Sequence, residues 1–244
     1  MNTEAQEQPK VTLYWLDQSR SQRIVWLLEE AKIKYDIEVF KRTPERLAPP
    51  SLKKVHPLGK APVLSIESPG AAAPYVLAES GFIVEYIAEH FAPHLIPARY
   101  APGKQGPGLE TESWMRYRFY MHYAEGILTG PRIPFFLRPV TRAIVSQVEA
   151  AYFKPNYDTQ FPFLESQLVS SPEGGKFLCG SELSAADILM SFPLSAAKAA
   201  GYFTKEKCPK LWAYVEMIEG MEGQKKAIAK IEEVTGEPYQ EFSA

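Results

Sequence analysis

VTLYWLDQSRSQRIVWLLEEAKIKYDIEVFK, residues 11–41, is the stretch that decides the fold. Its opening residues, 11–16, are apolar and β-prone, which predicts a buried strand. From Arg20 to about Lys32, apolar residues recur at the spacing of an amphipathic helix. Residues 35–41 then alternate apolar and charged side chains, as a half-buried strand does. Strand, helix and strand together predict a βαβ unit, with parallel strands and a right-handed crossover.

The chain after this unit continues with short elements. A short helix is expected at 51–55, a strand at 62–66, and a returning strand at 75–77 beyond a turn rich in Gly, Pro and Ala. A further helix opens at Glu79 and ends near residue 91. This order suits a four-stranded sheet with helices on both sides. The fold class predicted for residues 10–92 is an α/β domain.

The second half of the chain has a different character. Residues 93–107 are rich in Pro and Gly and predict a linker. Helical patterns follow, with no convincing strand, at 110–128, 140–168, 184–200 and 209–231. Because the strands and these helices are segregated along the chain, we expect a separate all-α domain over residues 108–235.

Composition excludes several classes of function. The 244 residues carry a net charge of −2 without a basic run, which argues against nucleic-acid binding. The two cysteines, Cys179 and Cys208, form no CxxC pair, and the four histidines lack the spacing of metal ligands. Residues 1–10 are polar, and no apolar stretch is long enough to span a bilayer. We therefore expect a soluble cytoplasmic protein without a metal.

Ser19 lies between the first predicted strand and the first predicted helix. Together with Gln22 it fits the S-x-x-Q capping box, which is a purely structural interpretation. The functional interpretation is that a hydroxyl at a helix N-terminus donates a hydrogen bond to a bound thiolate. A thiol with a pKa of about 8.5 becomes largely ionised at neutral pH after a decrease of about two units, each worth about 1.4 kcal/mol.

Residues 56–64, HPLGKAPVL, form a second motif. Pro62 opens a strand after a small residue and is a candidate cis-proline. The backbone of Ala61 would then face outward, where it could pair with an extended ligand as an added strand. The alternative is an ordinary strand that begins with proline.

Three further groups of polar residues have both a structural and a functional interpretation. Glu79 and Ser80 open a helix, where they either cap it or bind an amino-acid head group. Ser184 and Asp187 are interpreted as a capping box without a chemical role. The cluster of aromatic and basic side chains in helix 110–128 belongs to the core, to an interface or to a ligand pocket.

These motifs, in this order, resemble the cytosolic glutathione transferases, within a fungal and bacterial branch. The resemblance covers residues 10 to 230 and is carried by five segments. They are DQSRSQR with IVWLLEE at 17–30, APPSLKKVHPLGKAP at 48–62, LAESGFI at 77–83, HYAEG at 122–126 and FLCGSELSAADI at 177–188.

The resemblance implies a thioredoxin-like fold for residues 10–92 and a role for individual residues. Ser19 matches the activating serine of serine-type members, with Arg23 four positions further on. Ala61 matches the residue whose backbone binds the cysteinyl unit of glutathione, and Lys60 a position whose side chain reaches the glycine carboxylate. Glu79 and Ser80 match the pair that binds the γ-glutamyl end.

The resemblance also implies an activity: transfer of glutathione, as co-substrate, to electrophilic and mostly apolar small molecules, with a peroxidase side activity. It further implies a homodimer and a role in detoxification and stress response. The second-substrate pocket is expected to include Tyr14, Arg116, Tyr120 and Tyr123. Tyr14, Ser21 and backbone amides are alternatives to Ser19 as the group that activates the thiol.

The first alternative function is a non-catalytic regulator or ligand carrier with the same fold. A second is a transferase with one dedicated biosynthetic substrate. Peripheral association with membranes through the last helices is disfavoured, because residues 232–244 are polar.

Overall fold

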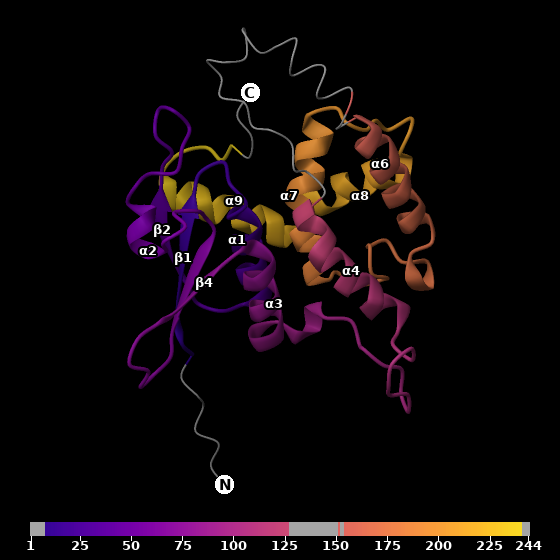
Figure 1. Cartoon of the computed structure of the whole chain (residues 1–244), viewed down its shortest axis with the longest axis horizontal. Helices are drawn as coiled ribbons and strands as arrows, with labels where there is room; N and C mark the ends of the chain where they lie inside the picture. Colours follow the sequence, from indigo (N-terminus) through magenta and orange to yellow (C-terminus); the bar gives the residue numbers. More distant parts are fainter. Residues whose placement is uncertain (1–7, 127–150, 152–153, 241–244) are drawn as a thin grey trace. The chain divides into compact units, whose positions relative to one another are not determined.

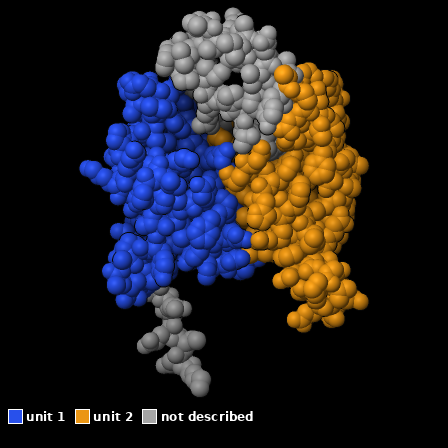
Figure 2. Space-filling view, in the orientation of Figure 1, with its two compact units in different colours: residues 1–93, 222–244 blue, residues 94–221 orange. Residues whose placement is uncertain are grey.

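In a computed structural model the chain divides into two compact units (Figure 2). Unit 1 holds Met1–Pro93 and Glu222–Ala244, and unit 2 holds His94–Met221. The structure describes residues 8–126, 151 and 154–240. The first unit boundary coincides with the start of the expected linker.

Unit 1 contains a four-stranded sheet in the order β2-β1-β3-β4. The strands are β1 (Lys10–Leu16), β2 (Asp36–Phe40), β3 (Val63–Glu67) and β4 (Tyr75–Ala78). β1 and β2 are parallel, whereas β3 pairs antiparallel with both β1 and β4. This confirms the predicted βαβ unit and the hairpin that follows it.

The helices of unit 1 are α1 (Gln22–Ala31), α2 (Leu52–Val55), α3 (Ser80–Phe91) and α9 (Glu222–Thr235). Figure 1 shows the sheet between α2 on one side and α1 with α3 on the other. α1 packs against α3 and α9. Its apolar face, which includes Ile24, Leu27 and Leu28, is completely buried. The mixed sheet flanked by helices confirms the predicted thioredoxin-like fold.

The described part of unit 2 is helical apart from isolated β-bridges. Its longer helices are α4 (Glu112–Gly126), α6 (Lys154–Val169), α7 (Ala185–Ala199) and α8 (Pro209–Glu219). α7 packs against α4 and α8, and α6 packs against α8. The fold class predicted for this half is confirmed, although most of the part of helix 140–168 before residue 154 lies outside the described residues, as do residues 127–128.

The helix expected at 209–231 is wrong, because two helices occupy this stretch. α8 ends at Glu219 and α9 begins at Glu222. The amide of Gly220 caps α8 by donating to the carbonyl of Glu216 at 3.1 Å, and the chain turns there. α9 then belongs to unit 1, so the structure differs from the expected helical domain over 108–235 at its C-terminal end.

The expected capping box at the start of α7 is confirmed. Ser184 is the N-cap, and its hydroxyl accepts a hydrogen bond from the amide of Asp187 at 3.4 Å. The carboxylate of Asp187 accepts in return from the amide of Ser184 at 3.0 Å. It also accepts from the Tyr214 hydroxyl at 2.7 Å and from the Leu178 amide at 3.0 Å. These bonds tie α7 to α8 and to the loop before it, which is a folding role.

Candidate functional site

The candidate residues of unit 1 meet at one edge of the sheet. Tyr14 of β1 pairs with Val63 of β3, and Val63 pairs with Ala78 of β4. The C-terminal ends of β1 and β4 therefore lie at the same edge as the start of β3. Ser19 follows β1, Ala61 precedes β3, and Glu79 follows β4. Strand register thus brings together segments that lie about twenty to sixty residues apart in the sequence.

Ser19 is held in a network of short-range hydrogen bonds at this edge. Its hydroxyl donates to the carbonyl of Leu16 at 2.7 Å. The same oxygen accepts from the amide of Ser21 at 3.1 Å and lies 2.8 Å from the Ser21 hydroxyl. The Ser21 hydroxyl in turn accepts from the amide of Leu16 at 3.4 Å. Ser19 is 8% exposed and Ser21 is completely buried.

Counting hydrogens fixes the direction of the bond between the two hydroxyls. A serine hydroxyl has one hydrogen and two lone pairs. The hydrogen of Ser19 goes to the carbonyl of Leu16, which can only accept. The hydrogen between the two oxygens therefore belongs to Ser21, and Ser21 donates it to Ser19. Both lone pairs of Ser19 are thus filled, one by the amide and one by the hydroxyl of Ser21.

The capping box expected from Ser19 and Gln22 is wrong. α1 begins at Gln22, and its N-cap is Ser21, whose side chain makes no capping hydrogen bond. The hydroxyl of Ser19 bonds to the amide two residues on, which precedes the helix. Since α1 starts later than the capping box requires, the first turn of the helix is not capped by the Ser19 side chain.

Arg42 was missed by sequence reasoning and fixes the turn before Ser19. Its guanidinium donates to the carbonyl of Asp17 from Nε at 3.0 Å and to the carbonyl of Gln18 from Nη2 at 3.0 Å. Its amide donates to the carboxylate of Asp17 at 2.8 Å. Parallel register, which pairs Leu16 with Phe40, places Arg42 beside this turn. The parallel pairing of β1 with β2 was the signal that could have indicated this contact of Arg42.

Ala61 and Lys60 lie directly before β3. The peptide bond between Ala61 and Pro62 is cis, as predicted. Ala61 is half-buried and packs against the cluster that Leu16 forms with neighbouring apolar side chains. Lys60 is exposed, so its ammonium is accessible to an anionic ligand at this edge.

Glu79 adopts an unusual backbone conformation between β4 and α3. Its φ of 72° and ψ of 122° lie in a region that glycine favours. Glu79 is the N-cap of α3, but its side chain makes no capping hydrogen bond and is exposed. Ser80, the first residue of α3, is buried. The structural interpretation of Glu79 as a side-chain cap is therefore wrong, and its carboxylate stays accessible.

The residues expected to line a second-substrate pocket have different surroundings. Tyr14, in unit 1, is half-buried with its ring centroid 6.4 Å from that of Phe40. Tyr120, in unit 2, is completely buried, and burial raises the pKa of its hydroxyl. Tyr123 donates to Gln160 Oε1 at 3.2 Å and stacks on Phe119 at 5.1 Å. Burial raises the pKa of Tyr123 to about 12, so it stays protonated near neutral pH. Because Tyr120 is completely buried, it belongs to the core of unit 2 and not to the surface of the expected pocket.

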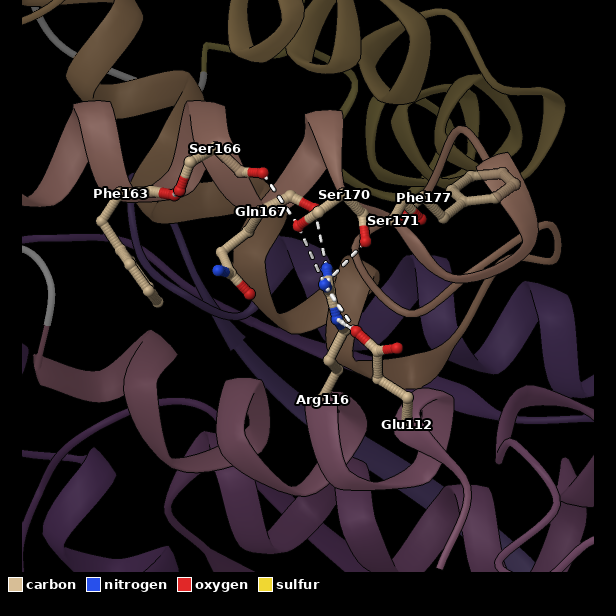
Figure 3. A network of polar contacts seen from close by, with 8 residues as sticks. All are labelled: Glu112, Arg116, Phe163, Ser166, Gln167, Ser170, Ser171 and Phe177. Atoms are coloured by element: carbon tan, nitrogen blue, oxygen red, sulfur yellow. Dashed lines mark hydrogen bonds and ion pairs between the residues drawn. The ribbon is translucent and has the colours of Figure 1, made fainter.

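Arg116 has a structural role in unit 2 (Figure 3). Its Nη1 donates to the carbonyl of Gln167 at 2.7 Å, and its Nη2 donates to the carbonyl of Ser170 at 2.7 Å. These carbonyls lie at the C-terminal end of α6, where helices leave acceptors unpaired. Glu112, one turn earlier in α4, pairs with the same guanidinium at 2.7 Å. These donors cap α6, and the expectation that Arg116 also lines a pocket stays a prediction.

Within the described ranges, no group of three or more His, Cys, Asp or Glu side chains is arranged to hold a metal ion. Both cysteines are buried thiols. Among the helices that the structure describes, none is long and apolar enough to cross a membrane.

Comparison with known proteins gives consistent matches. Residues 9–89 match the model of the glutathione S-transferase N-terminal domain, and residues 129–222 match that of the C-terminal domain. Glutathione S-transferase 1 of Saccharomyces cerevisiae is 31% identical over 228 residues, which cover 88% of this chain and 92% of the yeast protein. Glutathione S-transferase 3 of Schizosaccharomyces pombe is 26% identical, covering 92% of this chain and 89% of its own.

A solved structure agrees with these sequence matches. The crystal structure of a glutathione S-transferase from Actinobacillus pleuropneumoniae is 28% identical and has a TM-score of 0.65. The alignment covers 90% of this chain and 92% of that one. The identity to the yeast enzyme over nearly the full length of both chains, together with both domain models and the fold, shows that the chain belongs to the cytosolic glutathione transferase family.

Proposed function

We propose that the chain binds reduced glutathione at the sheet edge and transfers it, as a thiolate, to electrophilic small molecules. The observation that carries this proposal is the meeting of Ser19, Ala61 and Glu79 at one edge of the sheet. One hydroxyl, one backbone segment and one carboxylate there match the three parts of glutathione. These are its thiol, its extended cysteinyl backbone and its γ-glutamyl ammonium.

Each part of glutathione has a proposed contact. The backbone of Ala61 pairs with the cysteinyl unit as an added strand. The exposed carboxylate of Glu79 binds the ammonium, and the α3 N-terminus at Ser80 favours the adjacent carboxylate. The Lys60 ammonium pairs with the glycine carboxylate. Together these contacts fix the sulfur near Ser19 and supply proximity to the electrophile.

Ser19 acts as a hydrogen-bond donor to the thiolate. To do so, it keeps its hydrogen on the side of the Leu16 carbonyl, which it contacts at 2.7 Å, and the sulfur replaces that carbonyl as the acceptor. A hydrogen bond to a charged acceptor is stronger than the one it replaces. Because both lone pairs of Ser19 are filled, Ser19 is not suited to take the thiol proton. That proton passes to solvent, and the hydroxyl stabilises the sulfur anion that remains.

The bonding change in the transfer is simple. The sulfur lone pair forms a bond to the electrophilic carbon, and the leaving group departs with its bonding electrons, or the electrons pass to a conjugated acceptor that solvent protonates. A peroxide oxygen is a second class of acceptor, because thiolate attack there breaks the O–O bond. Ser19 helps by raising the thiolate fraction. Among the expected pocket residues, Tyr14, Arg116 and Tyr123 stay proposed for the second substrate.

Replacement of Ser19 tests this function. We expect Ser19→Ala to raise the pKa of bound glutathione by about 1–2 units, since a hydrogen bond to a charged group is worth about 1.5–3 kcal/mol. Turnover of an activated aryl halide near pH 7 should fall by about 10- to 100-fold, and recover partly as pH rises. Steady-state kinetics across pH measure both effects. Unchanged turnover would remove Ser19 from the mechanism and favour Tyr14 or backbone amides.

The non-catalytic alternative makes a different prediction. A regulator or ligand carrier with this fold would bind glutathione but give no turnover with any electrophile in a panel of aryl halides, enones and peroxides.

We place the protein in the cytoplasm as a homodimer with a role in detoxification and stress response. Light scattering at micromolar concentration tests the dimer, and a monomer mass would contradict it.

A further inference from the structure

The Ser19 hydroxyl is one member of a closed hydrogen-bonded ring. The amide of Leu16 donates to Ser21, Ser21 donates to Ser19, and Ser19 donates to the carbonyl of Leu16. The ring joins the last residue of β1 to the N-cap of α1. Exposure differs around it, because Ser19 is 8% exposed whereas Ser21 is completely buried. Of the two serines, Ser19 is therefore the more accessible.

We propose that Ser21 is a positioning residue, which orients the Ser19 hydroxyl and strengthens it as a donor to the glutathione thiolate. This inference rests on the proposed function of Ser19. Two donors of Ser21, its amide at 3.1 Å and its hydroxyl at 2.8 Å, occupy the lone pairs of Ser19. The group that Ser19 presents to a ligand is then its hydrogen.

The same two bonds increase the strength of the donor. A hydroxyl that accepts hydrogen bonds is polarised, so its own O–H becomes a better donor. If the sulfur replaces the Leu16 carbonyl as the acceptor from the same side, the Ser19 O–H hardly changes direction, so both bonds from Ser21 to its lone pairs persist. The bond from the Leu16 amide to Ser21 polarises the Ser21 hydroxyl in the same direction.

Replacement of Ser21 by alanine separates this role from a contact with glutathione. The change removes the hydroxyl and leaves the amide of residue 21 in place. We expect Ser21→Ala to raise the pKa of bound glutathione by about 0.3–1 unit, less than Ser19→Ala, since one neutral hydrogen bond is lost in place of a charged one. Ultraviolet absorbance of the thiolate, titrated against pH in the purified complex, measures the shift.

A double-mutant cycle shows whether Ser21 acts through Ser19. We expect the variant with both serines replaced to match Ser19→Ala alone, because without the Ser19 hydroxyl there is nothing for Ser21 to orient. Additive shifts would overturn the inference, as would a Ser21→Ala titration that matches the wild type. If Ser19→Ala itself shifts nothing, the proposed role of Ser19 fails as well, whereas a shift in Ser19→Ala without one in Ser21→Ala overturns only the role of Ser21.

Two controls exclude a merely structural effect. S-methylglutathione carries no thiolate, so its affinity should be the same in wild type and Ser21→Ala, and a large loss of affinity would contradict a positioning role. Ser65→Ala replaces a buried serine in β3 of unit 1 and should leave the thiol pKa unchanged. If Ser21→Ala does not fold, Ser21→Cys keeps a weaker donor of similar size and should shift the pKa in the same direction.

Discussion

The chemistry of the Ser19 hydroxyl follows from its hydrogen bonds more than from its position in the sequence. Sequence reasoning placed it correctly between β1 and α1, but it predicted a capping box that α1 does not have. The bond that decides its chemistry comes from Ser21, which was considered only as an alternative donor. Which of two nearby serines faces a ligand depends on burial, and burial here depends on where α1 begins.

Glu79 gives a prediction in which stability and binding change in opposite directions. Its φ of 72° and ψ of 122° strain any residue other than glycine, by about 1–3 kcal/mol. We expect Glu79→Gly to increase the free energy of unfolding by about that amount and to weaken glutathione binding by loss of the carboxylate. Urea unfolding and calorimetric titration measure the two effects.

Glu79→Ala is the matched control for this pair of effects. It removes the same carboxylate but keeps a side chain at the strained position, so it should weaken binding equally without the gain in stability. Equal unfolding free energies for the glycine and alanine variants would show that the backbone at residue 79 is not strained.

At the scale of elements, local pattern predicted most of unit 1, because β1 is an apolar, β-prone run and α1 and β2 each have one clear period. Periodicity did not predict where one helix ends and the next begins. Residues 209–231 have a continuous helical pattern, yet Gly220 separates α8 from α9. A glycine near a helix end is a weak signal, and what α9 packs against is set by tertiary structure. The contacts of Arg42 are also set by tertiary structure, because its partners lie about 25 residues away in the chain.

Gly223 is the residue that lets α9 approach α1. A Cβ there would lie 2.0 Å from Glu30 Oε1 and 2.5 Å from Nε1 of the buried Trp26. We expect Gly223→Ala to decrease the free energy of unfolding by about 1–3 kcal/mol, although alanine is the better helix former. Chemical denaturation with tryptophan fluorescence measures this.

Gly126→Ala, in α4, is the control for helix propensity. A Cβ at that position meets nothing within 4 Å, so the substitution should be neutral or stabilising. If Gly223→Ala were also stabilising, the close contact between α9 and α1 would be contradicted.

At the scale of the whole molecule, the two units and the family were predictable from the sequence, because the order of the motifs is specific. The assignment of α9 was not, since residues 222–235 follow the helical unit in sequence but pack on α1 and β2 of unit 1. The roles of Arg116 and Tyr120 were not predictable either. A polar or aromatic side chain on a helix has no sequence signal that separates a pocket from a buried contact.

Stability should decrease at alkaline pH because of Cys179. Burial, helped by the nearby Asp187, raises the pKa of this thiol in the folded state. A group whose folded pKa is raised stabilises fully below its unfolded pKa, about 8.5, and loses this contribution as pH rises further. The loss is about 1.4 kcal/mol per pH unit.

Cys179→Ala isolates this effect from the other titrating groups. Urea unfolding of wild type and variant between pH 7 and 10 should show that any stability advantage of the wild type shrinks above about pH 8.5. A difference between the two proteins that stays constant over this range would show that Cys179 ionises as readily in the folded state as in the unfolded one.

The central claim is that the chain binds glutathione as a thiolate whose proton passes to solvent. Isothermal titration with reduced glutathione at about pH 7, in two buffers of different ionisation enthalpy, tests it most directly. We predict micromolar to low-millimolar binding, with release of up to about one proton per glutathione bound, and much less release in Ser19→Ala. Binding whose heat is the same in both buffers would contradict thiolate formation, and no binding would contradict the proposed function itself.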